Sequence, residues 1–261
     1  MSTDINGVLR IEKDGAIATL TLTRPDAFNA INDDLRRGLI QAVAQIDTDP
    51  DIRVVIMKGE GRGFCAGADL KGGLSAMPTD HMLEAEYRPS LVGIANSPKI
   101  WIAQVHGAAA GIGAAYAMNC DMVVMADNAS LYMAFAAIAL VPDGGNTWLL
   151  LKGMGYHRAL QAIIEGRKIP AAECLQHGLV NHVVPEDELE TATLAMANRI
   201  AAAAPLAAAG AKKILRNISN ASFSDAFSAE AQIQGHLTQT ADFREGVQAF
   251  VEKRKPVFKG K

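Results

Sequence analysis

The chain is 261 residues long, which is enough for one large domain or for a core domain with an appendage. Hydrophobic residues make up 49% and charged residues 20%, a balance that excludes a disordered chain. The net charge is −3 and the basic residues are scattered apart from a C-terminal run, so we expect no nucleic-acid partner.

Cysteine usage and hydropathy indicate the compartment. Cys65, Cys120 and Cys174 lie far apart, form no CxxC pair and cannot all pair with one another, which predicts a reducing compartment and no zinc site. The N-terminus MSTDINGVLR has an acidic residue and no apolar run, so no signal peptide is expected. Polar residues interrupt every long apolar stretch. Together these features predict a soluble cytoplasmic protein with no membrane partner.

The first half of the chain alternates between strand and helix patterns. The segment 17–24, IATLTLTR, alternates Thr and Leu and predicts a strand. Asn32 or Asp33 then caps a helix whose apolar positions share one face: Leu35, Leu39, Ile40, Val43 and Ile46. Short buried strands are predicted at 53–59, 101–107 and 122–127. This alternation predicts an α/β fold with layered sheets and right-handed crossovers.

From about residue 146 the pattern becomes helical. Six helical segments follow one another, beginning with GNTWLLLKGMG and ending with DFREGVQAFVEKR. Several are rich in alanine, whose small side chain suits close packing against other helices or another subunit, although alanine is also the best helix former. We predict a core at residues 1–200 and a helical C-terminal region at residues 201–261.

Two glycine-rich turns are the candidates for ligand binding. GRGFCAGADLK (61–71) follows one predicted buried strand, and HGAAAGIGAAYAMNCD (106–121) follows the next. Glycine and alanine allow a backbone to approach a ligand closely, and such turns leave N–H groups unpaired at the start of a helix. Two of them, each after a buried strand, could converge on one ligand atom.

Two other kinds of site fit the sequence less well. Gly61, Gly63 and Ala66 spell GxGxxA, but a dinucleotide-binding fingerprint should open a long helix directly after the first strand, and Asp69 and further glycines interrupt it here. A serine hydrolase is disfavoured because no GxSxG elbow is present. None of the six histidines has a metal-ligand spacing.

Asp143, in the stretch ALVPDGG (139–145), has two interpretations. Pro-Asp-Gly is ordinary turn chemistry, which favours a structural role on local sequence alone. The preceding residues 129–142, ASLYMAFAAIALVP, carry no charge, so we expect that segment to be buried. A carboxylate that emerges from it is either solvated at the surface or kept in a dry site for a chemical purpose.

The sequence resembles the crotonase, or enoyl-CoA hydratase/isomerase, superfamily over essentially its whole length. The resemblance includes TLTRPDAFNAIN (21–32), FCAGADL, the glycine-rich segment after His106, the VPDGG turn and the ending DFREGVQAFVEKRKPVFKGK. The VPD stretch and this ending are similar to those of the ring-epoxide isomerases of phenylacetyl-CoA breakdown. The family fold is a spiral of strands and helices, with C-terminal helices that assemble homotrimers and often hexamers.

The resemblance implies a set of site residues. The backbone N–H groups of Ala68 and Ile112 would hold a thioester oxygen. Four residues of the first turn would contact coenzyme A, which carries the substrate and is no separate cofactor: Ala66, Asp69, Leu70 and Lys71. Phe250 or Lys253 of the tail would reach a neighbouring subunit's ligand.

The chain departs from the family's hydratases at two positions. Hydratases carry a glutamate where this chain has Ala115 and a second where it has Phe135. Adding water to a double bond requires two positioned acid/base groups, so ordinary hydratase activity is not expected. Ile112 also replaces a usual glycine, although only its N–H is needed.

These residues leave three hypotheses about function. In the first, Asp143 is the single acid/base of an enoyl-CoA isomerase, with Phe135, Leu140 and Val141 raising its pKa. In the second, Asp143 serves a hydratase or a hydrolase as a nucleophile or by activating water. In the third, the chain is a coenzyme A-binding oligomer without catalysis. Residues 72–92 would wall the acyl pocket, with His81 or Glu84 more typical of a solvated helix face than of a second acid.

Overall fold

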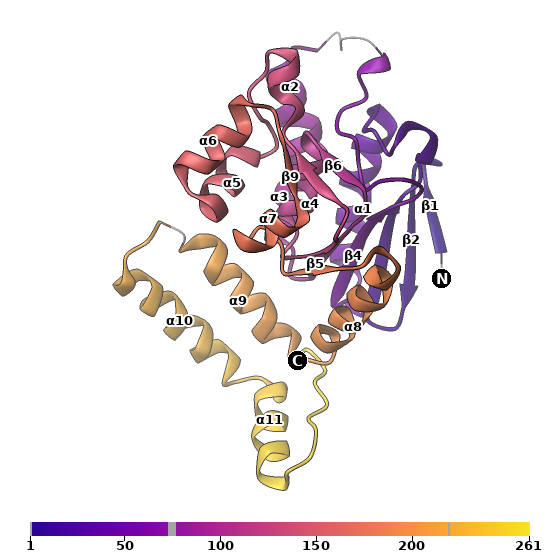
Figure 1. Ribbon diagram of the computed structural model, residues 1–261. Coiled ribbons are helices and arrows are strands. Elements are labelled where there is room, and N and C mark those ends of the chain that lie inside the picture. Colours follow the sequence, from indigo (N-terminus) through magenta and orange to yellow (C-terminus); the bar gives the residue numbers. More distant parts are fainter. Residues whose placement is uncertain (1, 73–76, 219) are drawn as a thin grey trace.

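The computed structural model describes residues 2–72, 77–218 and 220–261, and shows a mixed α/β fold (Figure 1). Within this part of the chain the main sheet has seven strands in the order β1-β2-β3-β4-β5-β7-β10. The pairs β1–β2 and β2–β3 are antiparallel, and every later pair is parallel. The strands are β1 Ser2–Ile5, β2 Leu9–Asp14, β3 Ile17–Leu22, β4 Val54–Gly59, β5 Ile100–Val105, β7 Met122–Ala126 and β10 His182–Val184.

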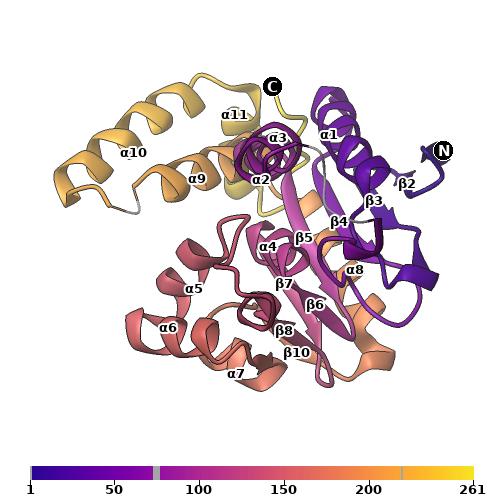
Figure 2. The ribbon, with the colours of Figure 1, turned by 90° about the horizontal axis from the view of Figure 1, so that it is seen from above.

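A smaller sheet lies beside the first. It has the order β6-β8-β9, with β6 (Ala108–Ala110) parallel to β8 (Ser130–Tyr132) and β8 antiparallel to β9 (Lys168–Pro170). Helix α4 (Ile112–Asn119) is buried along its whole length and contacts strands of both sheets, as the view from above shows (Figure 2). The predicted strands at 17–24, 53–59, 101–107 and 122–127 are confirmed as β3, β4, β5 and β7.

Helix α1 (Asp33–Thr48) forms as its apolar spacing predicts. Asn32 is the N-cap, and its side-chain oxygen accepts a hydrogen bond from the N–H of Leu35 at 3.0 Å. Four of the five predicted apolar positions are buried and Ile40 is half-buried. The helix therefore covers the sheet with the face that the sequence periodicity indicated.

The remaining α-helices are α2 Thr79–Met82, α3 Arg88–Asn96, α5 Asn146–Met154, α6 Tyr156–Ile164, α7 Ala171–Gln176, α8 Leu189–Ala201, α9 Pro205–Asn217, α10 Phe223–Leu237 and α11 Ala241–Glu252. Helices α5, α6, α8, α9, α10 and α11 follow the six predicted helical segments, whereas α2, α3 and α7 were not among them. Among the described residues no single helix is long and apolar enough to cross a membrane, although the bent pair Glu186–Ala201 and Pro205–Asn217 has a suitable length and composition. Short helices of other types are η1 Pro25–Ala27, η2 Leu70–Gly72, η3 Leu83–Tyr87, η4 Ala134–Ile138 and η5 Glu186–Glu188.

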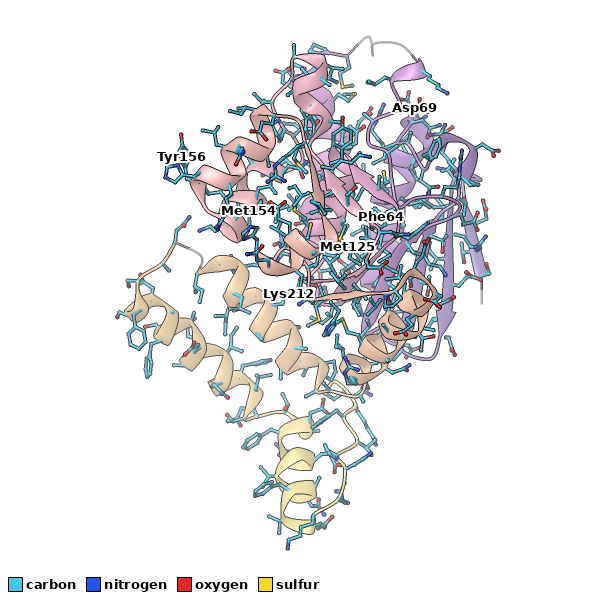
Figure 3. All side chains as sticks on the ribbon, viewed as in Figure 1. Phe64, Asp69, Met125, Met154, Tyr156 and Lys212 are labelled. Carbon is cyan, nitrogen blue, oxygen red and sulfur yellow. The ribbon has the colours of Figure 1, made fainter. Side chains whose placement is uncertain are left out.

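The C-terminal helices α10 and α11 extend away from the sheets, whereas α9 contacts β5 (Figure 1). Lys212 attaches α9 to the core at the junction seen in Figure 3. Its buried Nζ lies 2.8 Å from Asp121 Oδ2 and donates hydrogen bonds to the carbonyls of Ile94 and Lys99. Helix α8 ends at Ala201 and α9 begins at Pro205, but the division of the chain into two domains at residue 200 stays a prediction.

The expectation that residues 129–142 are buried is wrong for the second half of that segment. The part up to Phe135 contributes to the core, whereas Ile138, Leu140 and Val141 are 50%, 53% and 80% exposed. The physical reason is local: in η4 Phe135 is buried but residues 136–138 are already exposed, and the left-handed Ala139 (φ 58°) that ends η4 precedes the exposed Leu140 and Val141. The apolar composition alone did not indicate this turn.

Candidate active site

The two glycine-rich turns run side by side, as the sequence predicts. The N–H of Cys65 donates a hydrogen bond to the carbonyl of Ala108 at 3.2 Å, and the N–H of Ala110 donates to the carbonyl of Cys65 at 2.8 Å. Gly67 permits this approach, because a Cβ there would lie 2.9 Å from the Ala110 oxygen and 3.7 Å from the Cα of Gly111. The two turns therefore present their next residues, Ala68 and Ile112, beside each other.

Ala68 has a free N–H on an exposed face. On either side of it, Gly67 accepts a hydrogen bond from the N–H of Ile31 at 2.8 Å, and Asp69 donates one to the Ile31 carbonyl at 3.0 Å. Both neighbours bond Ile31, so the N–H of Ala68 points to the opposite side, as alternate groups of a paired strand do. Within the described residues it donates no hydrogen bond. It is available to a ligand.

Ile112 supplies a second available N–H. It is the first residue of α4, where an N–H has no intrahelical partner, and it donates to no other described residue. The preceding Gly111 has φ 54°, a left-handed conformation that favours glycine. Ile112 is 2% exposed, and its side chain packs against the turn that carries Gly144. A negative charge placed here would also be favoured by the α4 dipole.

The turn that carries Asp143 packs directly on this helix start. Gly144 and Gly145 both have positive φ, at 62° and 87°. A Cβ at Gly144 would lie 2.8 Å from the Cβ of Ala115 and 2.9 Å from Cδ1 of Ile112. The structure thus packs the predicted carboxylate turn against the side chain of the residue whose N–H is one predicted oxyanion donor.

The Asp143 carboxyl is largely withdrawn from water. Its Oδ1 is buried and has no hydrogen-bond partner among the described residues. Burial raises the pKa of the carboxyl to about 6, the direction that the sequence analysis predicted. The expected cause is only partly correct: Phe135 is buried nearby, but Leu140 and Val141 are exposed and flank the opening instead.

A cavity of about 530 Å³ opens in front of Asp143. One wall is the continuous helical run α2-η3-α3. Its π-type turn at Leu83–Tyr87 lies just before Pro89, and proline has no N–H to continue the α-helical pattern. Tyr87 is 2% exposed, and its hydroxyl has no hydrogen-bond partner in the described chain. Burial outweighs the nearby Arg36 guanidinium and raises the pKa of Tyr87. Residues of the predicted pocket wall between 79 and 92 thus line the cavity, and residues 73–76 lie outside the described residues.

The acidic residues and the histidine of this wall are not well placed as a second acid. Glu84 lines the cavity, but its side chain is mostly exposed and its carboxylate lies 3.1 Å from Arg88. Glu86 pairs with Arg36 at 2.5 Å, and His81 is exposed. The prediction of a solvated face at His81 and Glu84 is confirmed.

The predicted coenzyme A residues share one loop but differ in availability. Ala66, Leu70 and Lys71 are exposed. Asp69 instead pairs with Arg24 at 2.9 Å, which lowers the pKa of its carboxyl, and accepts a hydrogen bond from the N–H of Lys71. Its carboxylate thus holds the loop to the strand end. No pattern in the sequence indicated this pairing with Arg24, 45 residues away in the chain.

The two positions that the resemblance matches to hydratase glutamates border the site. Ala115 is fully buried against the Gly144 turn, and Phe135 is buried with its ring tip 3.7 Å from where a Cβ of Gly111 would lie. Both positions are apolar. The dinucleotide alternative fails on structure, because β4 and its turn lead to the three-residue η2 rather than a long helix.

Comparison with known proteins defines the class. A model of the enoyl-CoA hydratase/isomerase family matches residues 12–261, and the chain belongs to this family. Its fold is that of the crotonases: a crystal structure of enoyl-CoA hydratase from Bacillus anthracis superimposes with a TM-score of 0.93 at 32% identity, over 97% of this chain and 100% of that one. The chain is an enzyme of that family, and the spiral fold predicted from the sequence is confirmed.

Relatives carry both hydratase and isomerase names. The chain is 37% identical over 254 residues to a Rhodobacter capsulatus protein named "Probable enoyl-CoA hydratase", covering 97% of this chain and 98% of that one. It is 34% identical over 251 residues to the 1,2-epoxyphenylacetyl-CoA isomerase of Escherichia coli, covering 94% and 95%. The names of the relatives therefore do not decide between hydration and isomerisation, and the residues of the site have to separate these two reactions.

Proposed function

We propose that the enzyme moves a double bond along the acyl chain of an enoyl-CoA, with Asp143 as its single acid/base group. The observation that carries this proposal is one largely buried carboxyl, its Oδ1 without a hydrogen-bond partner, on a turn that packs against Ile112. The free N–H groups of Ile112 and of Ala68 on the adjacent turn would hold the thioester oxygen. The substrate is a coenzyme A thioester, and no separate cofactor takes part.

The reaction would proceed through an enolate. Asp143 removes a proton from the carbon next to the carbonyl or from the γ carbon, and the electron pair moves onto the thioester oxygen. Each backbone N–H that faces such an oxyanion is worth about 3–4 kcal/mol of barrier. The protonated Asp143 then returns a proton to the other carbon. One proton is removed and one is added, so in ordinary water the product has the mass of the substrate.

Ala115 and Phe135 support isomerisation over hydration. Hydration needs one group to activate water and another to protonate carbon, whereas proton migration needs only one. Both positions that would supply the hydratase carboxylates are apolar here and lie against the Gly144 turn and Gly111. The Escherichia coli relative is itself named as an isomerase.

The coenzyme A part would lie along the exposed loop of Ala66, Leu70 and Lys71, with Asp69 bracing it through Arg24. CoA thioesters should therefore bind far more tightly than the free carboxylic acids, because much of the recognition is to the nucleotide and pantetheine. Calorimetry with matched pairs of acid and thioester tests this, and equal affinities would remove the coenzyme A assignment.

A hydratase or hydrolase is the second candidate, because the Rhodobacter capsulatus relative is named as a hydratase and Asp143 could activate water. Incubation with a 2-enoyl-CoA and with a 3-enoyl-CoA, followed by mass spectrometry, separates the candidates. Isomerisation changes the absorbance and conserves mass, hydration adds one water, and hydrolysis releases free coenzyme A. A protein that only binds these ligands would show none of these changes.

A further inference from the structure

We infer that Asn146 is a positioning residue that fixes the Ile112 N–H and the Asp143 turn in register. This inference rests on the proposed function, since it assigns a role toward the oxyanion donor and the base named above. Its basis is a buried side-chain amide that bonds both parts of the site at once. The sequence shows no sign of it.

Asn146 lies at the start of α5 and is completely buried. Its Nδ2 donates one hydrogen bond to the carbonyl of Gly111 at 3.0 Å and one to the carbonyl of Asp143 at 3.0 Å. Its backbone N–H also donates to the Asp143 carbonyl, at 3.0 Å. Both amide hydrogens are thus used, and they join two loops that lie 32 residues apart in the chain.

The bond to Gly111 acts on the proposed oxyanion donor. The Gly111 carbonyl and the Ile112 N–H belong to the same peptide group. A hydrogen bond accepted by the carbonyl draws electron density toward its oxygen, and this makes the N–H of that peptide a stronger donor. The Gly111 carbonyl also accepts a hydrogen bond from the N–H of Ala114 at 3.1 Å, and the Gly111 N–H donates to the carbonyl of Tyr132 at 2.9 Å. Asn146 therefore adds a further restraint to a glycine peptide.

The bond to Asp143 acts on the proposed base. The turn at Asp143 has two consecutive glycines with positive φ, so its own backbone restrains it weakly. Asn146 holds its carbonyl by two hydrogen bonds, from the side chain and from the backbone. The carboxyl therefore keeps a defined position relative to the Ile112 N–H, as a positioned acid/base group requires.

The surroundings of Asn146 are not those expected of a residue selected for stability alone. An Asn after Gly-Gly at the start of a helix predicts an N-cap, but the N-cap here is Gly145 and the Asn146 side chain points inward. Its Oδ1 is buried without a partner among the described residues, so this oxygen has lost its bonds to water without gaining others. The site keeps a costly amide where it meets the two proposed catalytic groups.

The test compares wild type, Asn146→Ala and Thr193→Val. Thr193 is also fully buried, and its hydroxyl donates to Leu189 within α8, so this control removes a buried hydrogen bond elsewhere. With a 3-enoyl-CoA, Asn146→Ala should lower kcat by about 10-fold or more and leave KM within about threefold, since part of an oxyanion donor's effect is lost. The control should keep the wild-type kcat.

A spectroscopic measurement separates positioning from stability. Infrared difference spectra of a bound, unreactive acyl-CoA with a ¹³C-labelled thioester carbonyl report how strongly the oxygen is hydrogen-bonded. Its stretch should shift to lower frequency in wild type and in Thr193→Val, and less in Asn146→Ala. A carbonyl stretch and a kcat in Asn146→Ala equal to those of wild type would overturn the inference.

Two further variants keep the outcomes distinct. Asp143→Asn tests the proposed function, which fails if this variant retains full turnover. If Asp143→Asn is inactive and Asn146→Ala is fully active, the proposed function stands and only the inference about Asn146 is overturned. If Asn146→Ala does not fold, Asn146→Asp decides, because it keeps the shape and leaves one donor hydrogen at most. If neither folds, the amide is a requirement of folding and the assigned role is wrong.

Discussion

Asp143 is easier to protonate in the folded protein than in the unfolded chain. Burial raises the pKa of its carboxyl to about 6, whereas an unfolded aspartate titrates near pH 3.9. Because the folded state binds this proton more tightly, the proton contributes to the free energy of unfolding. That contribution is fully present below the pKa of the unfolded chain and is lost as pH rises through the pKa of the folded protein. The free energy of unfolding therefore falls as pH rises from about 4 to about 6, and this contribution of Asp143 is absent at higher pH.

Replacing Asp143 by Asn should remove this loss of stability at high pH, because asparagine does not ionise. At pH 8 the Asp143→Asn variant should be more stable than wild type by about 2–3 kcal/mol, and the difference should vanish near pH 4. Thermal and urea unfolding across this pH range measure it. Parallel stability curves for the two proteins would show that the carboxyl is solvated in solution and not desolvated as the structure indicates.

The same titration should limit turnover. A base must be ionised to accept a proton, so kcat for double-bond migration should fall as pH drops below about 6. The slope should be one proton, because a single carboxyl is involved. A flat kcat from pH 4.5 to pH 8, with the protein still folded, would exclude Asp143 as the base.

At the scale of elements, the turn at residues 142–145 joins the Asp143 carboxylate to α4. Its two glycines allow a controlled comparison, because both have positive φ but only Gly144 packs against α4. Gly144→Ala would place a methyl group 2.8 Å from Ala115 and 2.9 Å from Ile112, in addition to the strain of positive φ. Gly145→Ala would meet nothing within 4 Å and carries only the strain.

Gly144→Ala should therefore lower the free energy of unfolding by about 2–4 kcal/mol and reduce turnover. Gly145→Ala should cost about 1–2 kcal/mol with a smaller effect on kcat. Urea denaturation and steady-state kinetics of the two variants give the comparison. Equal effects in both would mean that contact between the turn and α4 has no part in the site.

Sequence periodicity and local chemistry predicted the regular elements well for a physical reason. β4 is a short run of buried apolar residues and α1 repeats its apolar positions on one face, so each pattern follows directly from burial. The exposed stretch at Leu140 and Val141 was missed, because a left-handed Ala139 decides the chain direction there and composition does not record it. The contacts of Asn146 and the Arg24–Asp69 pair depend on tertiary neighbours, which no local pattern encodes.

At the scale of the whole molecule, the C-terminal helices are only partly covered. Helix α10 buries no residue, and Phe223 and Phe250 are both 86% exposed, with Phe227 and Val251 also largely exposed. Lys212 fixes α9 to the core through Asp121, and α10 packs against α9. We propose that it packs against further copies of the chain, in a homotrimer or a hexamer built from two trimers.

The protein should sediment as a trimer or a multiple of it at micromolar concentration. Phe250→Glu should weaken this assembly if the exposed face of α11 is at an interface, because the charge would have to be desolvated. Analytical ultracentrifugation of wild type and of this variant measures the effect. A wild-type monomer would contradict the assembly, and with it any contact of Phe250 or Lys253 with a neighbouring subunit's ligand.

The most direct test of the account is proton exchange by Asp143→Asn in deuterated water. Asparagine fits the same turn, so the variant should fold and bind acyl-CoA as wild type does. Isomerisation should fall by about 10²–10⁴-fold, and deuterium incorporation at the α or γ carbon, followed by mass spectrometry, should fall with it. Turnover and exchange at wild-type rates would contradict the account, since a carboxylate that only caps a turn can be replaced by asparagine without loss of activity.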